Sequence, residues 1–300
     1  MKKALFTSKN LIGDALYISL AWRAWWEKNK AEYDTVDLLT LDDHVKILYY
    51  GMGVPLRGMY YSTPGHLFEY DFQHTFDVSA AFKLSDEKGQ HVAESYADLL
   101  GVEIERKPDR SHLVPFYQPP TRNEAVEAAI RNGEKQILFT DEHKGSILIS
   151  MFSASCSSRK GERPNKMLPW PKWLPILKEI RKQFPDNPIR FLGAPTDMVP
   201  NGYAMNLVTA GEYMLGIPLD RLAHIMRESL FVLTLDNGMA HLAASQGARE
   251  FIFYPRVLGT HYILPFGNRN MKYIHMDPTS LNPAQAVWGL QQAWKEWGIV

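Results

Sequence analysis

The residues best suited to chemistry gather where a buried strand is expected to meet a helix: Asp236, Asn237, Gly238 and His241. The apolar run at residues 230–235 predicts the strand, and a helix follows the polar corner. An Asp or Asn at a helix start accepts bonds from the first backbone N–H groups. The helix N-terminus offers N–H donors and partial positive charge to an anion, and His241 lies within one turn. The corner therefore predicts a site for a phosphate-bearing ligand.

Charge and cysteine content narrow the classes of protein to consider. The 300 residues hold 33 Lys and Arg against 33 Asp and Glu, so the formal net charge is zero. Sequence-independent nucleic-acid binding depends on neutralising phosphates, so this balance disfavours it without excluding a local basic patch. The single cysteine, Cys156, excludes an intrachain disulfide framework and a metal site built from several cysteines. A reducing cytoplasm is the expected compartment.

Neither a signal peptide nor a membrane span is expected. The apolar stretch that follows Met1, Lys2 and Lys3 gives way to polar residues at 7–10. No uninterrupted apolar run approaches the ~18 residues of a spanning helix. We therefore expect a cytoplasmic protein with no integral membrane contact, and peripheral association with the inner face of the cytoplasmic membrane stays open.

The chain alternates strands and helices twice. A strand at 3–7, a helix at 15–30 and a strand at 36–41 form a β-α-β unit, which implies a parallel sheet. A second alternation follows a division near 141–146. Its expected strands lie at 147–151, 189–192, 231–235 and 251–254, and its expected helices at 170–183, 220–227 and 283–297. Two further helices are expected before the division, at 91–100 and 124–132. The segment 51–82 shows no period and is expected to be irregular. Two such doubly wound halves would bind ligands between them, at the carboxyl ends of their strands.

Four blocks of this sequence resemble, in order, the family 9 glycosyltransferases, whose best-known members are ADP-heptose:lipopolysaccharide heptosyltransferases. The blocks are Ile12-Gly13-Asp14 before a helix; residues 147–150, with a Ser/Lys/Arg loop and Trp170-Pro171; residues 189–195; and residues 222–226 leading into 235–243. The fourth block is the most specific. The match covers the C-terminal half well and residues 1–45 fairly, whereas residues 50–140 are unmatched.

The resemblance implies an α/β protein with the GT-B fold, in which two Rossmann-like, doubly wound domains face a central cleft. The acceptor-binding domain would span 1–143 and the nucleotide-sugar-binding domain 144–282, with a helix at 283–300 that crosses back to the first domain. The implied activity is inverting sugar transfer from an ADP-heptose-like donor to a hydroxyl acceptor, with a cell-envelope glycan such as lipopolysaccharide as the expected acceptor. No metal and no cofactor is implied, because the nucleotide-sugar is a co-substrate.

Asp14, beside Gly13, matches the catalytic aspartate on the family's acceptor side. The implied role is a general base that takes the proton of the acceptor hydroxyl as its oxygen attacks the anomeric carbon. Inversion is a single displacement, so one carboxylate suffices. From position alone, Asp14 would only cap the helix that follows it. The resemblance favours the base.

Residues of the polar corner match the family's diphosphate-binding turn. The backbone amides of Asn237, Gly238 and Met239 would carry most of the phosphate binding, and His241 would donate to a phosphate oxygen. Asp236 would hold the loop or a sugar hydroxyl, since a carboxylate repels phosphate. Asn237 departs from the family's usual Asp-Thr-Gly, although both residue types offer a side-chain donor. The alternative is a capped core helix with an internally bonded His241.

The loop before Trp170 supplies further candidates for donor binding. Lys166 would neutralise charge on the departing diphosphate, and Ser153 would contact the donor. The loop is longer than the corresponding loop of the family. For each of its polar residues, a place in a solvated basic loop with no ligand is an equally good interpretation. Gly193 ends a strand where GT-B proteins contact the nucleoside, but glycine is common at strand ends.

The segment between Tyr60 and Phe82 is rich in aromatic and histidine residues. Its acids and histidines match no defined metal-site spacing, so we expect no metal there. Aromatic walls of an acceptor loop and plain core packing are the two interpretations.

Other function classes stay open at the level of sequence. One is a glycosyltransferase that acts on modified DNA or on protein. Another is a nucleotide-sugar-binding protein that has lost transfer, which the unmatched middle of the chain keeps in consideration. A third, an NAD-dependent oxidoreductase, is disfavoured because no Gly-x-Gly-x-x-Gly follows the first strand.

Overall fold

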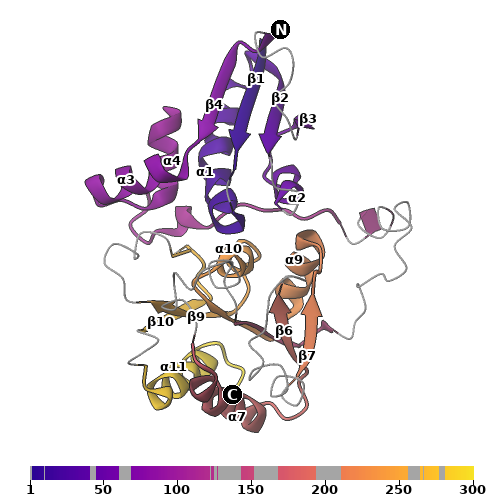
Figure 1. The fold of residues 1–300 in the computed structure, drawn as a ribbon, viewed down its shortest axis with the longest axis vertical. Helices are drawn as coiled ribbons and strands as arrows, with labels where there is room; N and C mark the ends of the chain where they lie inside the picture. Colours follow the sequence, from indigo (N-terminus) through magenta and orange to yellow (C-terminus); the bar gives the residue numbers. More distant parts are fainter. Residues whose placement is uncertain are drawn as a thin grey trace.

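The computed structural model contains two parallel sheets, each with helices packed on it, one above the other in Figure 1. It describes these residues: 2–9, 11–40, 45–60, 69–121, 123–124, 127, 143–151, 168–193, 211–255, 264–265, 267–276 and 281–300. Among these, every strand pairing is parallel. No helix in the described ranges is long and apolar enough to cross a membrane.

The N-terminal half holds a four-stranded sheet in the order β3-β2-β1-β4. Its strands are β1 (Lys2–Ser8), β2 (Tyr33–Thr40), β3 (Leu56–Tyr60) and β4 (Phe72–Phe76). Its helices are α1 (Ile12–Asn29), α2 (Lys46–Tyr50), α3 (Val78–Lys88) and α4 (Val92–Leu100), with a 3-10 turn, η2, at Ser111–Leu113. Five successive residues of α1, 15 to 19, are buried, because the helix lies between the sheet, α4 and the C-terminal half.

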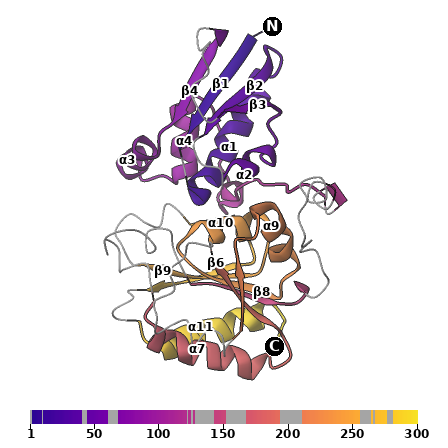
Figure 2. The ribbon, with the colours of Figure 1, turned by 45° about the vertical axis from the view of Figure 1, so that its right-hand side comes forward.

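The C-terminal half holds a six-stranded sheet in the order β10-β9-β8-β5-β6-β7. Its strands are β5 (Ile147–Ser150), β6 (Ile189–Gly193), β7 (Glu212–Leu215), β8 (Phe231–Leu235), β9 (Glu250–Pro255) and β10 (Met271–Met276). Its helices are α7 (Trp170–Gln183), α9 (Leu219–Glu228), α10 (Gly238–Ser245) and α11 (Pro283–Glu296). In Figure 2, α9 and α10 cover the face toward the N-terminal half, and α7 and α11 cover the opposite face.

The strand order places a crevice in each half. In the second sheet the chain winds outward from β5 through β6 and β7, then returns to add β8, β9 and β10 on the other side. The order thus reverses between β5 and β8. In the first sheet it reverses between β1 and β4. Ligands of open α/β sheets bind outside the carboxyl ends of the strands at such reversals.

Four strands fall where the sequence indicated none. β3 and β4 lie inside the segment expected to be irregular, and β7 and β10 were not expected. Each of the four has at most one fully buried position among its described side chains, and all four are outer strands of their sheets. Outer strands carry a weaker hydrophobic signal, because one edge and often one face meet solvent. The helix expected at 124–132 lies mostly outside the described residues.

Helix α1 begins at Ile12, three residues earlier than the sequence indicated, so Gly13 and Asp14 belong to its first turn and not to a loop. Leu11 precedes the helix without a side-chain cap, and its carbonyl accepts from the Ala15 N–H at 2.9 Å. The idea that Asp14 merely caps the helix is therefore wrong. Packing against the other half holds this helix end in place.

Helix α11 does not cross back to the N-terminal half. It packs against α7 beneath the second sheet, and Trp294 contacts the rings of Phe184 and Phe231 at 5.1 and 5.8 Å. Trp294 is fully buried there. This position of α11 is explained by the burial of Trp294 among apolar rings of the C-terminal half, because a buried tryptophan contributes a large apolar area.

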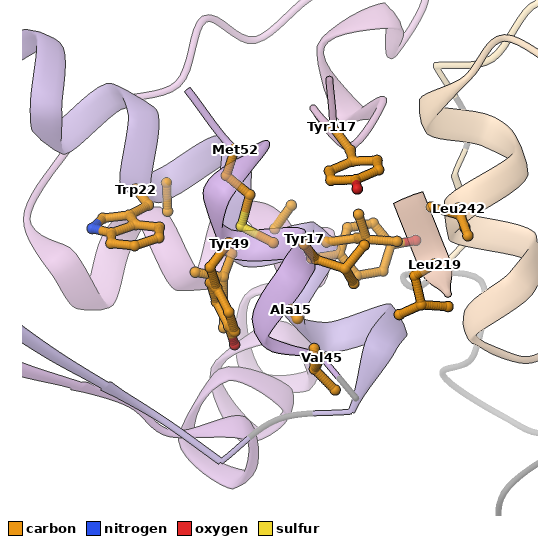
Figure 3. Close-up of a cluster of buried hydrophobic side chains, with 14 of the residues drawn as sticks. Ala15, Tyr17, Trp22, Val45, Tyr49, Met52, Tyr117, Leu219 and Leu242 are labelled. Carbon is orange, nitrogen blue, oxygen red and sulfur yellow. The ribbon is translucent and has the colours of Figure 1, made fainter. Parts of the chain in front are cut away.

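One hydrophobic cluster runs through both halves. Tyr17 and Tyr49 of the N-terminal half share it with Leu219 of α9 and Leu242 of α10, and Tyr117 lies above them (Figure 3). Two polar bonds cross beside it. His224 Nε2 bonds to the carbonyl of Pro120 at 2.6 Å, and the side-chain amide of Gln246 donates to the carbonyl of Tyr117 at 3.0 Å. The halves therefore meet through a packed core.

Candidate active site

The polar corner after β8 is built around Asn237, which caps α10. Its Oδ1 accepts from the N–H groups of Met239 and Ala240 at 3.0 and 3.3 Å. Its Nδ2 donates to Ser150 Oγ at 3.0 Å. Ser150 ends β5, so one side chain joins the carboxyl ends of β8 and β5, the two strands that flank the reversal. The expected cap is confirmed at Asn237.

The N-termini of α1 and α10 touch at two glycines. A Cβ on Gly13 would lie 2.6 Å from His241 Cδ2, and one on Gly238 would lie 2.7 Å from Ile12 Cβ. Real Cβ atoms do not approach so closely, so both positions require glycine for close contact. Two helix N-termini, each with its partial positive charge, therefore converge at one place between the halves. That place suits an anion.

His241 is buried, with 6% of its surface exposed, and its ring packs on Tyr17 with centroids 4.6 Å apart. Tyr17 packs on His91 from α4 at 4.8 Å. His91 caps α4, because its Nδ1 accepts from the Ala93 N–H. The proton must then sit on Nε2, which donates to the carbonyl of Leu264 at 2.9 Å. Burial lowers the pKa of His91 to about 3, so the ring is neutral.

Acidic groups surround the same contact. Asp14 is half-buried in the first turn of α1, and Asp236 is buried at the end of β8. The pKa of Tyr17 is raised well above its ordinary value by burial first, and then by the charges of Tyr254, Asp236, Asp14 and Glu250. These groups therefore lie close enough to interact with one phenol. The base candidate and the donor corner meet around Tyr17.

Glu250 is the most deeply buried of these acids. It is fully buried at the start of β9, where Thr234 Oγ1 donates to its Oε1 at 3.1 Å. Its Oε2 has no hydrogen-bond partner among the described residues. Burial raises the pKa of Glu250 well above its ordinary value, and the Thr234 bond offsets a part of this shift. Burial therefore favours the neutral, protonated form of this carboxyl.

Most of the predicted site residues come together at this contact. Two helix starts supply them: Gly13, Asp14, Asp236, Asn237, Gly238, Met239 and His241. The Met239 amide is engaged by the Asn237 cap, so in this state it is not available to a phosphate. Gly193 ends β6, which pairs with β5 on the side away from β8. Ser153 and Lys166 lie outside the described residues.

Sequence reasoning missed four residues of this region: Ser150, Tyr17, His91 and Glu250. Tyr17 had a detectable signal, since it lies three residues after Asp14 and so on the same helix face. Ser150 had another, as the polar end of a buried strand. His91 and Glu250 had none, because their partners, Leu264 and Tyr17, are far away in sequence.

Two polar residues of the aromatic segment between Tyr60 and Phe82 have structural roles. Asp77 caps α3 by accepting from the N–H groups of Ser79 and Ala80. His74 packs in β4 between Phe72 and Phe76, and burial lowers its pKa. Among the residues that the structure describes, no group of three or more His, Cys, Asp or Glu could hold a metal ion.

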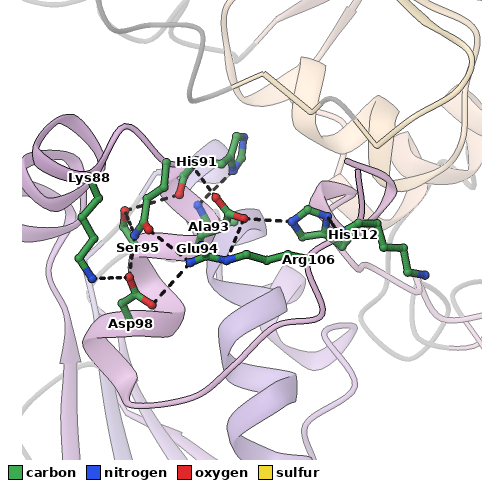
Figure 4. A network of polar contacts seen from close by, with 10 residues as sticks. Lys88, His91, Ala93, Glu94, Ser95, Asp98, Arg106 and His112 are labelled. Atoms are coloured by element: carbon green, nitrogen blue, oxygen red, sulfur yellow. Dashed lines mark hydrogen bonds and ion pairs between the residues drawn. The ribbon is translucent and has the colours of Figure 1, made fainter. Parts of the chain in front are cut away.

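A surface hollow of about 590 Å³ lies against α4, away from the polar corner. Its acids are already engaged in a network (Figure 4). Glu94 bonds to Arg106 and His112 at 3.4 and 3.2 Å, and Lys88 donates to Asp98 at 2.8 Å. An acidic, internally paired lining is unsuited to a phosphate, so the corner remains the candidate site.

Solved structures of glycosyltransferases have this architecture. A family 9 glycosyl transferase from Veillonella parvula is 13% identical in sequence. The match covers 98% of this chain and 97% of that chain, with a TM-score of 0.62. The E. coli ADP-heptose lipopolysaccharide heptosyltransferase II is 13% identical, with 99% and 100% covered and a TM-score of 0.66. The chain has a GT-B fold. The expected two doubly wound halves are thereby confirmed.

The likeness is one of fold. The E. coli heptosyltransferase WaaC, solved with ADP, is similar at 12% identity and a TM-score of 0.63, with 97% of this chain and 99% of that chain covered. At the level of sequence, no protein-family model and no curated protein matches the chain. What the GT-B fold does in this protein must be argued from its site.

Proposed function

We propose that the chain is a glycosyltransferase that moves a sugar from a nucleotide-sugar to a hydroxyl acceptor. One observation carries the proposal. The helix that follows β1 and the helix that follows β8 meet end to end at Gly13 and His241. Asp14 follows Gly13 in the first turn of α1, so its carboxylate is proposed to face the start of α10. A base and a leaving-group site side by side are what a single displacement requires.

Donor binding follows from the corner's geometry. The diphosphate would lie at the converging starts of α1 and α10, where the backbone amides of Asn237 and Gly238 supply donors and two helix dipoles supply positive potential. Lys166 and Ser153 are proposed to add a charge and a hydroxyl from the loop after β5. Gly193 is proposed to face the nucleoside.

Asp14 would act as the general base. It takes the proton from the acceptor hydroxyl as that oxygen attacks the anomeric carbon, and the bond to the diphosphate breaks as the new one forms. Attack opposite the leaving group inverts the anomeric centre, so no second carboxylate is needed. We propose that the charge that develops on the diphosphate is met by the helix ends and Lys166, without a metal or another cofactor.

An ADP-heptose-like donor and an acceptor on a cell-envelope glycan are the proposed substrates. Structural neighbours support the donor class, since WaaC was solved with ADP and with ADP-2-deoxy-2-fluoro heptose. Such an acceptor would place the protein in the cytoplasm, peripherally at the inner face of the membrane. Action on modified DNA or protein would instead show a strong salt dependence or a peptide acceptor.

A thermal-shift screen with ADP-, UDP-, GDP- and CMP-sugars tests the donor class, followed by transfer assays with the best binder. A ligand that binds only the folded state raises the melting temperature by mass action. Asp14→Asn is expected to abolish transfer and keep nucleotide binding. Full activity of Asp14→Asn would refute the mechanism, and no stabilisation by any of the nucleotide-sugars would refute the function. Binding without turnover by the wild type would indicate a protein that has lost transfer.

A further inference from the structure

The contact between the halves contains a column of three rings, His91–Tyr17–His241. The N-terminal half supplies His91 and Tyr17, and the C-terminal half supplies His241. At one end, His91 donates to the carbonyl of Leu264 in the C-terminal half. At the other, His241 lies against Gly13. The column therefore spans the contact between the halves, and each of its ends touches the opposite half.

Tyr17 occupies the centre of this column. Its ring contacts both imidazoles, with interplanar angles of 75° and 58°, and it is 1% exposed. His241 is consequently packed against Gly13 and Tyr17, which lie one turn apart on the same face of α1. Since α1 also carries Asp14, the packing of Tyr17 on His241 sets where the first turn of α1 lies relative to α10.

We propose that Tyr17 is a positioning residue, whose ring fixes His241 and through it the placement of Asp14 beside the donor corner. This role rests on the proposed function for its catalytic consequence, but the fixed orientation of His241 is a property of the protein without substrate. Tyr17 does not need to touch the donor or the acceptor. It acts through His241, because the imidazole is the group that both helix starts share.

The packing of rings gives the proposal its specific prediction. Tyr17→Phe keeps the ring and should keep the column, whereas Tyr17→Leu removes it. We expect kcat with ADP-heptose to fall about tenfold to hundredfold in Tyr17→Leu, because a small misplacement of a reacting group has costs of this order. The KM for ADP-heptose and the affinity for ADP should change less than kcat does, because the backbone amides of Asn237 and Gly238 do not depend on the Tyr17 ring. Tyr17→Phe should retain most of the activity.

A double-mutant cycle distinguishes positioning from general destabilisation. In a His241→Ala background, Tyr17→Leu should reduce kcat no further than about twofold, because the group through which it acts is gone. Trp25→Leu is the matched control. Trp25 is a buried aromatic residue of the same helix, α1, and its ring packs against Phe6 and Phe72. Its effect should add to that of His241→Ala. Additive losses for Tyr17→Leu, or a Tyr17→Phe loss as large as that of Tyr17→Leu, would overturn the proposal.

Nitrogen-15 NMR of the His241 ring in the substrate-free protein supplies a test that is independent of turnover. The wild type and Tyr17→Phe should show the ring-current shift that the aromatic ring at position 17 imposes on the imidazole, and Tyr17→Leu should lose it. Tyr17→Met, whose long side chain fills more of the space, replaces Tyr17→Leu if that variant fails to fold. An unchanged His241 spectrum in the folded variant would refute the role of Tyr17. A wild type that neither binds ADP nor consumes ADP-heptose would refute only the proposed function.

Discussion

Asn237 of β8's end and Ser150 of β5's end are joined side chain to side chain, with Nδ2 donating to Oγ at 3.0 Å. The two strands lie at the point where the sheet order reverses. The same Asn237 caps α10 through its other amide atom. One residue therefore joins the two strands at the reversal and starts the helix whose N-terminus is the proposed donor site.

Asn237→Asp should separate capping from ligand binding. Aspartate retains the cap, because its oxygen still accepts from the N–H of Met239, and its charge suits a helix N-terminus. It cannot donate to Ser150, and it repels a diphosphate. We expect ADP affinity to fall with little loss of stability, as measured by calorimetry and urea unfolding.

Asn237→Ala is the matched control for that prediction, because it removes the cap without adding charge. It should lower the free energy of unfolding by about 1 kcal/mol. An Asn237→Asp protein that binds ADP as tightly as the wild type would contradict the placement of the diphosphate at this corner.

Gly13→Ala should disturb the joint between the halves. The added methyl group would lie 2.6 Å from His241 Cδ2, in a buried imidazole that also packs on Tyr17. Overpacking of this kind costs about 1–3 kcal/mol of the free energy of unfolding. Urea unfolding measures the loss.

Removal of the imidazole should relieve the clash. In a His241→Ala background, Gly13→Ala should cost much less than it does alone. Equal costs in the two backgrounds would show that His241 does not confine Gly13.

His91 should make the protein lose stability as the pH falls. Burial lowers its folded pKa to about 3, below the ordinary histidine value, so the unfolded chain binds more protons between the two values. Stability is complete above the unfolded pKa and declines as the pH falls from about 6.5 toward 3. Denaturant unfolding at several pH values in this window measures the slope.

His91→Asn is expected to flatten that slope, since asparagine keeps a good cap on α4 and does not titrate. His91→Ala should flatten it as well and lower stability at neutral pH. A slope in His91→Asn equal to that of the wild type would assign the acid sensitivity to other groups.

Glu250 should contribute the opposite dependence. Burial raises its folded pKa above the unfolded value, so the folded protein binds the extra proton. Its contribution is present at low pH and is lost as the pH rises through the folded pKa. Glu250→Gln stays neutral at every pH, so the stability of the variant relative to the wild type should increase from mildly acidic to alkaline pH. A constant difference across that range would contradict a protonated, buried Glu250.

The polar corner could be predicted from sequence because its chemistry is local. An apolar run, an asparagine and a glycine in succession determine a strand, a cap and a close approach, and β8 and α10 lie where they were expected. The outer strands β3, β7 and β10 could not be predicted, since few of their residues are fully buried.

The contact between α1 and α10 could not be predicted from the sequence in the same way. The ring contact of Tyr17 with His241 links positions 224 residues apart, and nothing in the sequence near Tyr17 indicates it. Glu250 likewise carries no local sign that it is buried. Such features depend on contacts between segments that are far apart along the chain.

The hydrophobic cluster shared by the halves limits what recombination can do with this protein. A chimera that pairs the N-terminal half with the donor half of another GT-B protein would leave Tyr17 and Tyr49 facing side chains shaped for a different partner. Leu219 and Leu242 would be missing from the seam, and cavities in a packed core are costly. If the proposed function is correct, a new donor specificity should therefore be easier to obtain by altering the turn after β8 than by exchanging halves. An exchange of halves would disrupt the hydrophobic core that they share.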